Sequence, residues 1–135
     1  MSAPPPVVVG LAICRDVIRD AATANLSVIR SFSGHAFDSF QAIAEPFCVL
    51  TTLTDGKGEC ETELVVTFFG DGESYEYARL PGRVRFPDPL QLVECVYRLD
   101  AFPLAEPGVY LFTLLLNGQG AAQKSLRVYM REDSK

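Results

Sequence analysis

The sequence predicts an all-β protein, an antiparallel β-sandwich of about eight strands with at most one short helix. Short runs rich in Val, Leu, Phe, Tyr and Thr recur along its 135 residues, and Gly, Pro, Asn and Asp separate them. No long helical pattern lies between these runs. Such spacing is typical of a sandwich or barrel and disfavours a parallel α/β sheet.

The individual strands are expected where the apolar and β-branched residues concentrate. Asn117-Gly118 accepts the positive φ angles of a tight hairpin, so the last two strands should pair antiparallel. Pro81-Gly82 is expected to form a turn. The expected strands cover residues 7–14, 26–32, 47–54, 62–69, 75–80, 90–99, 109–116 and 122–130.

Two stretches do not match a strand pattern. Residues 15–25 mix charged and small side chains, so we expect a loop or one helical turn there. Residues 38–44 are the candidate for a short helix, which Pro46 would end. In this helix Phe40 and Ile43 would share one face.

Size and composition indicate one domain. A chain of 14.8 kDa buries one core, and its 48% hydrophobic and 21% charged residues are ordinary globular usage. We expect a Pro-rich N-terminal tail at residues 1–6, the sandwich domain at residues 7–130 and a C-terminal tail at residues 131–135.

The charge balance is acidic, with a net charge of −5 and a pI of about 4.8. This field repels phosphate, so the sequence disfavours nucleic acid and anionic membranes as partners. No basic residue precedes the apolar stretch at residues 7–14, which is too short to span a bilayer. The sequence therefore favours a cytoplasmic location.

The four cysteines are expected to be free thiols that behave as small hydrophobes. They lack any C-x-x-C pair, and a reducing cytoplasm disfavours disulfides. A zinc site would need these scattered cysteines and the single histidine to converge. They are Cys14, Cys48, Cys60 and Cys95.

No catalytic motif is convincing, and we expect neither an enzyme nor a bound cofactor. Ser33 and His35 lie too close in sequence for triad geometry, and no nucleophile elbow surrounds the serine. The acidic turn around Asp55 places Lys57 where a calcium ligand belongs, which favours a solvated turn. The arginines and aromatics around residues 75–86 fit an edge strand better than a partner contact.

The strand at residues 109–116 is apolar on both faces. Tyr110 is expected to face the core as a structural tyrosine corner, in which its hydroxyl bonds the preceding backbone. Val109, Leu111 and Leu115 would then point outward, and Val65 and Phe69 of a neighbouring strand would extend the patch. Such a face predicts a protein interface, unless residues 38–44 cover it from within.

Short segments near both ends carry a resemblance to a known family. They are Ile13-Cys14-Arg15-Asp16-Val17, residues 25–32, and residues 102–110 leading to Asn117-Gly118. Over residues 7–130 the chain resembles a family of small uncharacterised bacterial proteins, classed as a domain of unknown function. The resemblance implies an immunoglobulin-like sandwich in a bacterial cytoplasm and brings no activity or catalytic residues.

The interpretation that the sequence favours is a non-enzymatic interaction or assembly module. It would bind a protein partner or a second copy of itself through the outer face of residues 109–116, as a homo-oligomer, without nucleic acid or membrane. Two alternatives remain open. One is a small hydrolase with a site assembled from distant residues, for which a deep polar pocket around His35 would speak. The other is a secreted calcium- or carbohydrate-binding module.

Overall fold

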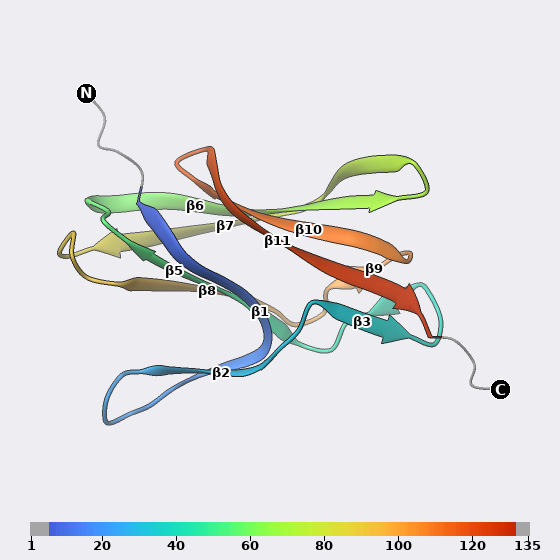
Figure 1. The fold of residues 1–135 in the computed structure, drawn as a ribbon, viewed down its shortest axis with the longest axis horizontal. Helices are drawn as coiled ribbons and strands as arrows, with labels where there is room; N and C mark the ends of the chain where they lie inside the picture. The colour runs from blue at the N-terminus through green and yellow to red at the C-terminus, as the bar shows by residue number, and fades with distance from the viewer. Residues whose placement is uncertain (1–5, 132–135) are drawn as a thin grey trace.

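The computed structural model describes residues 6–131, and every regular element in this range is a β-strand. Two main sheets pack face to face, and a two-stranded ribbon closes one side (Figure 1). The predicted all-β sandwich is therefore confirmed. The strands run from Val7 to Met130, and the expected tails lie outside the described residues except for Pro6 and Arg131.

The first sheet has four antiparallel strands in the order β2-β1-β5-β8. Their bounds are β1 (Val7–Arg19), β2 (Leu26–Ser31), β5 (Phe47–Thr54) and β8 (Val93–Leu99). The bounds predicted for β5 are correct. The loop expected at residues 15–25 is wrong in its first half, because β1 continues through Arg19 and pairs with β2.

The second sheet has five strands in the order β3-β11-β10-β6-β7. Their bounds are β3 (Gly34–Phe37), β6 (Gly58–Gly70), β7 (Glu73–Phe86), β10 (Gly108–Leu116) and β11 (Gln119–Met130). The hairpin predicted at Asn117-Gly118 joins β10 to β11, and both residues have positive φ. Strand β3 pairs parallel with β11, an exception to the antiparallel arrangement that the sequence predicted.

The strand order reproduces the immunoglobulin arrangement. Strands β1, β5 and β8 follow the order A-B-E of one immunoglobulin sheet, and β11, β10, β6 and β7 follow the order G-F-C-C′ of the other. The chain crosses between the layers from β5 to β6, from β7 to β8 and from β8 to β10, which places residues far apart in sequence on neighbouring strands.

Two further expectations are corrected. Pro81-Gly82 lies inside β7 and forms no turn; β7 is an edge strand, where a missing backbone N–H is tolerated. Residues 38–44 contain no helix. Instead β4 (Ala42–Ile43) pairs with β9 (Pro103–Leu104), and Ile43 is 66% exposed.

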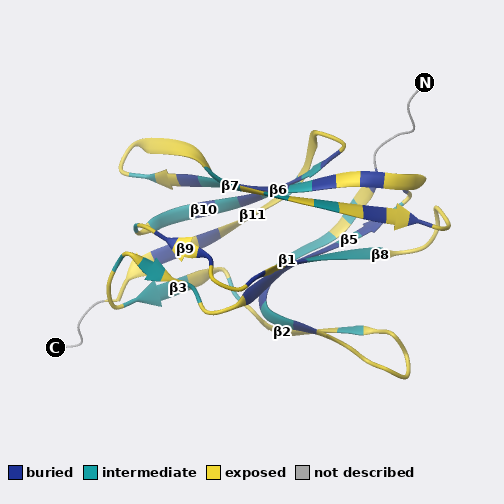
Figure 2. Cartoon of the chain, turned by 180° about the vertical axis from the view of Figure 1, so that it is seen from behind, coloured by how far each residue is buried: buried dark blue, intermediate teal, exposed yellow. Residues whose placement is uncertain are grey.

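The core lies between the two sheets, where strand alternation points one face of each sheet inward (Figure 2). The ring of Phe47 packs edge-on against Phe102 and Phe112, with ring centroids 5.9 and 6.2 Å away. Burying each such side chain contributes roughly 1.5–3 kcal/mol, so this interlocking holds the two layers together.

A second, smaller apolar cluster lies on the outer face of the four-stranded sheet. It contains Cys14, Val17, Cys48 and Leu50, with Leu26 and Val96 packed against them. After Cys14, β1 bends out of the sheet, and the β1–β2 hairpin projects as an extra layer beneath β5 and β8 (Figure 1). The hairpin thus encloses side chains that would otherwise face water.

Candidate functional site

A row of three polarisable side chains crosses the outer face of the four-stranded sheet. Cys14 of β1 lies opposite Cys48 of β5, and Cys48 lies opposite Arg98 of β8. Directly opposed residues of antiparallel strands project from the same face. The register therefore assembles two thiols and a guanidinium from segments far apart in the sequence.

Arg98 connects this row to the hairpin. Its Nη1 donates to Asp16 Oδ1 at 3.1 Å and to Cys48 Sγ at 3.4 Å. Its Nη2 donates to the carbonyl oxygen of Val17 at 3.2 Å. Further along the hairpin, Arg19 and Glu94 form a looser ion pair of 3.9 Å. One side chain of β8 thus holds the bend of β1 against the sheet.

The side chain of Arg15, from the same bend, extends toward Phe32 and the loop before β5. Its guanidinium carbon lies 5.3 Å from the ring centroid of Phe32, within cation–π range. Nη1 donates to the carbonyl oxygen of Pro46 at 3.3 Å and pairs with Glu45 Oε2 at 3.5 Å. The Arg15 side chain is 25% exposed, so the aromatic ring and the loop before β5 fix it in place.

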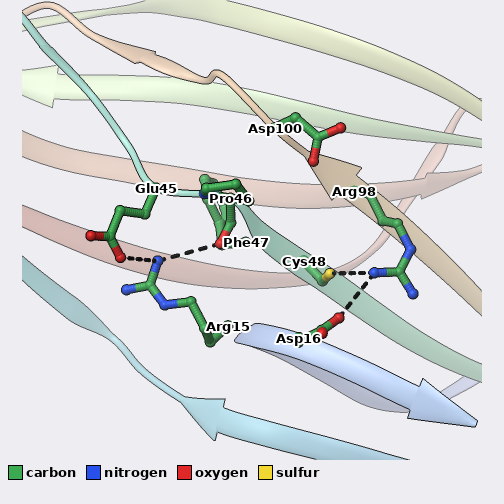
Figure 3. A pocket seen from close by; sticks show the side chains of 8 residues that line it. All are labelled: Arg15, Asp16, Glu45, Pro46, Phe47, Cys48, Arg98 and Asp100. Carbon is green, nitrogen blue, oxygen red and sulfur yellow. Dashed lines mark hydrogen bonds and ion pairs between the residues drawn. The ribbon is translucent and has the colours of Figure 1, made fainter.

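These groups surround an open pocket of about 420 Å³ (Figure 3). Arg15 and Glu45 lie on one side of it, and Arg98 and Asp100 lie on the other (Figure 3). Cys48 is at the base, between the two arginines. The lining residues are Arg15, Asp16, Glu45, Pro46, Phe47, Cys48, Arg98 and Asp100.

Charge and burial act in opposite directions on the groups around the pocket. The hydrogen bond from Arg98 lowers the pKa of Asp16, so this carboxyl stays ionised. Burial raises the pKa of the Cys48 thiol, and the charge of Arg98 opposes that rise. Burial, followed by the neighbouring Cys48, raises the pKa of Cys14. At neutral pH the row therefore consists of two thiols beside a permanent cation.

The lining offers two cations, three carboxylates and one thiol. It can bind polar groups of either charge, and the thiol can react with sulfur electrophiles. Within residues 6–131 no group of three or more His, Cys, Asp or Glu side chains is arranged to hold a metal ion.

His35 does not lie in this pocket. It sits on β3 between aromatic rings, with centroids 4.5 Å from Phe37 and 6.2 Å from Phe32, and burial lowers its pKa. Among the cavities of the described residues, the one that His35 lines holds only about 10 Å³ and is mostly apolar. The deep polar pocket that would have supported a hydrolase around His35 and Ser33 is therefore not formed there.

The acidic and basic clusters noted in the sequence face each other on β6 and β7. Arg79 pairs with Glu63 at 2.8 Å and with Glu76 at 2.7 Å. Arg83 lies 3.8 Å from both Glu59 and Glu61. Exposed pairs of this kind add little to stability, and they balance the charge of an edge strand.

The apolar face of β10 has the alternation that the sequence suggested. Tyr110 is fully buried, whereas Val109, Leu111 and Leu115 are half-buried on the outer side. On neighbouring β6, Val65 is buried and Phe69 is 42% exposed. The Tyr110 hydroxyl donates to the carbonyl oxygen of Glu106 at 2.7 Å, so it acts on the backbone just before its own strand.

The sequence reasoning named none of the pocket residues as functional. The sequence did contain a usable signal for Arg98. This charged residue stands between the apolar Tyr97 and Leu99, so it points to the opposite face of its strand. Arg15 and Asp16 had a weaker signal, since they directly follow the apolar run at residues 7–14. No sequence signal placed Cys14 opposite Cys48, because strand register is set by tertiary pairing.

Comparison with known proteins identifies no family for this chain. No protein-family model matches the chain, and no curated protein matches it. One similar solved structure is the Pseudomonas fluorescens alkylpurine DNA glycosylase AlkC bound to DNA containing an abasic site analog. The likeness has a TM-score of 0.49 and 8% sequence identity, and it covers 88% of this chain and 30% of that chain.

This comparison corrects the interpretation that the sequence favoured. A non-enzymatic module that binds a protein or itself and excludes nucleic acid is at odds with a similar structure that is a DNA-bound enzyme. That interpretation, including homo-oligomer formation through β10, is withdrawn. A likeness at this TM-score and identity assigns no activity to the present chain. In the part of the chain that the structure describes, no helix has the length and hydropathy of a membrane span.

Proposed function

We propose that the chain is a binding domain for a small zwitterion of the amino-acid class, held in the pocket between Arg15 and Asp100. The supporting observation is the placement of spare guanidinium donors and an unpaired carboxylate on opposite sides of one cavity (Figure 3). A ligand with both charges would complement both sides at once.

Arg15 supplies the cationic side. A guanidinium carries five N–H donors, and the two contacts of Arg15 both use Nη1. Within the described residues its Nη2 and Nε make no hydrogen bond. Two adjacent donors of this kind match a carboxylate, which they bind with fixed orientation. Packing over Phe32 holds the guanidinium ready, so little side-chain entropy is lost on binding.

Asp100 supplies the anionic side. It follows the last residue of β8 and is exposed at the rim, where it forms no ion pair within 4.0 Å of any described residue, although its charge acts on the neighbouring Arg98. An ammonium group is the natural partner for such a carboxylate. Asp16 cannot take this role, because Arg98 already holds it at 3.1 Å.

The size of the pocket fits a small ligand. Its volume of about 420 Å³ falls at the lower end of the usual range for ligand pockets, about 300–1,000 Å³. We place this binding activity in the cytoplasm, where free amino acids and small peptides are abundant ligands.

Isothermal titration calorimetry with a panel of free amino acids tests the proposal. We expect saturable binding of at least one of them, and no binding of its amide or its N-acetyl derivative. Asp100→Asn and Arg15→Gln should each weaken binding about tenfold or more, since a charge-assisted hydrogen bond contributes about 1.5–3 kcal/mol.

Glu73→Gln is the matched control, because Glu73 is an exposed carboxylate at the start of β7, on the other sheet. It should leave binding unchanged. Absence of saturable binding by every amino acid at millimolar concentration would refute the proposal. So would binding that survives both pocket substitutions.

A further inference from the structure

Cys14 and Cys48 are placed to react with each other. They are directly opposed on β1 and β5, and both belong to the small cluster on the outer face of the sheet. Opposed Cα atoms in antiparallel strands are about 4.5–5.5 Å apart. Disulfides span Cα separations of about 4.4–6.8 Å, so this pair can be bridged with little backbone movement.

A bridge between them would remain within reach of reducing thiols through the pocket that Cys48 lines, so the pair suits reversible oxidation. Both thiols are free in this structure.

The pocket gives one of the two thiols access to reagents. Cys48 lines the cavity although it is largely buried, and Arg98 Nη1 lies 3.4 Å from its Sγ, where the positive charge partly offsets the rise in the thiol pKa that burial causes. Cys14 is fully enclosed and does not line the pocket. Their roles should therefore differ, with Cys48 reacting first and Cys14 reacting second.

The other two cysteines lack this arrangement. Cys60 of β6 is opposed by Val84, and Cys95 of β8 is opposed by Thr51. Cys60 belongs to the inner core and Cys95 packs against it. Neither thiol lines the pocket that Cys48 lines. They serve as internal controls for any oxidation of the chain.

We propose that Cys14 and Cys48 form a redox-active dithiol that exchanges with low-molecular-weight disulfides entering through the pocket. Cys48 loses its proton to solvent, and its thiolate attacks one sulfur of the disulfide. The S–S bond of the reagent breaks, one thiolate leaves and takes up a proton, and Cys48 carries a mixed disulfide.

The second exchange closes the bridge. Cys14 loses its proton and attacks Cys48 Sγ, and the second reagent thiolate leaves and is protonated. Two protein thiols are thereby oxidised by two electrons while one disulfide is reduced to two thiols. Excess reduced thiol drives the same steps backward. This chemistry does not depend on the zwitterion, and its test uses no amino-acid ligand.

Oxidised glutathione is the reagent for the test. Native protein is incubated with it, quenched with acid, unfolded, and alkylated without reduction, and the free thiols are counted by mass spectrometry. We expect wild type to lose two of its four thiols, peptide mapping to show a Cys14–Cys48 disulfide, and dithiothreitol to restore all four. Cys14→Ser should instead accumulate one glutathione adduct on Cys48.

Cys60→Ser is the matched control, since it removes a buried thiol from the other sheet and should still form the Cys14–Cys48 bridge. Circular dichroism before the quench establishes that each protein is folded. The inference is overturned if folded wild type keeps four thiols, or if Cys60 and Cys95 oxidise as fast as Cys48. It is equally overturned if Cys14→Ser gains no adduct while wild type oxidises.

Discussion

The hydroxyl groups of Thr62 and Tyr97 are hydrogen-bonded to each other inside the sandwich, where they join the two sheets. Thr62 lies on β6 and Tyr97 on β8, and both are buried. Within the described residues no buried side-chain nitrogen or oxygen lacks a partner, so this pair satisfies itself in an otherwise apolar layer. Polar groups buried in this way are costly to separate.

Tyr97→Phe should destabilise the protein by about 1–3 kcal/mol, because the Thr62 hydroxyl would remain buried without a partner. Urea denaturation followed by circular dichroism measures the loss. The double substitution Tyr97→Phe with Thr62→Val removes both polar groups and should cost less than the two single losses added together. If the stability losses of the two single variants add up to that of the double variant, the hydrogen bond between Thr62 and Tyr97 does not contribute to stability.

Alkaline pH should destabilise the protein. Burial raises the pKa of Tyr97 to about 12 from 10.0, and burial also raises the pKa of Cys60 and Cys95 from 9.0. A raised pKa in an acid means that the unfolded chain loses its proton first. Stability is therefore fully present below pH 9 and falls as pH rises from about 9 towards 12.

Urea midpoints measured at several pH values test this dependence. The fall above pH 10 should be smaller in Tyr97→Phe than in wild type, because that variant lacks the buried phenol. A flat profile up to pH 12 would contradict the burial of these groups.

Gly82→Ala should destabilise the protein by about 1–3 kcal/mol through overpacking. A Cβ at Gly82 would lie 2.5 Å from Thr62 Oγ1 and 2.7 Å from Tyr97 Oη, the same pair that joins the sheets. Gly10→Ala is the matched control, since its Cβ would meet only Thr52 atoms at 3.8 Å. Thermal denaturation of the two variants should rank Gly82→Ala well below Gly10→Ala.

Arg98→Gln should loosen the β1–β2 hairpin without unfolding the sandwich. The change removes the ion pair to Asp16 and the bond to the Val17 carbonyl, which hold the bend of β1. Hydrogen exchange of β2 amides, followed by NMR or mass spectrometry, should accelerate at least severalfold while β10 amides stay protected. Arg79→Gln removes two ion pairs from the other sheet and should leave β2 exchange unchanged.

Acid should loosen the same hairpin in wild type. Because Arg98 lowers the pKa of Asp16 below its ordinary 3.8, the stabilisation is present above that value and is lost as pH falls through the lower, folded-state pKa. Uniform exchange across β2 and β10 at every pH would contradict a local role for this pair.

Tyr110→Phe should cost about 0.5–1.5 kcal/mol, the usual contribution of one hydrogen bond, because the bond to the Glu106 carbonyl is lost. Urea denaturation gives the loss. Amino-acid binding should be unaffected, since Tyr110 lies in the core and not at the pocket. A change in binding with unchanged stability would place Tyr110 in the site.

Local chemistry in the sequence determined several elements. Asn117-Gly118 specifies a two-residue hairpin by itself, because both residues accept positive φ. The apolar run at residues 47–54 is bounded by Pro46 and Asp55, which predicted β5 (Phe47–Thr54) correctly. Recurring short runs without helical periodicity were sufficient to identify an all-β sandwich.

Other elements were decided by tertiary contacts. Residues 15–19 are too charged to read as a strand, yet they extend β1 because β2 and Arg98 supply partners. Strand β3 is short and pairs parallel with β11, which no local pattern encodes. The pocket follows the same rule. Cys14, Cys48 and Arg98 meet only because strand order and register align them. Strands pair through backbone groups that every sequence shares, so the local sequence does not specify which residues become neighbours.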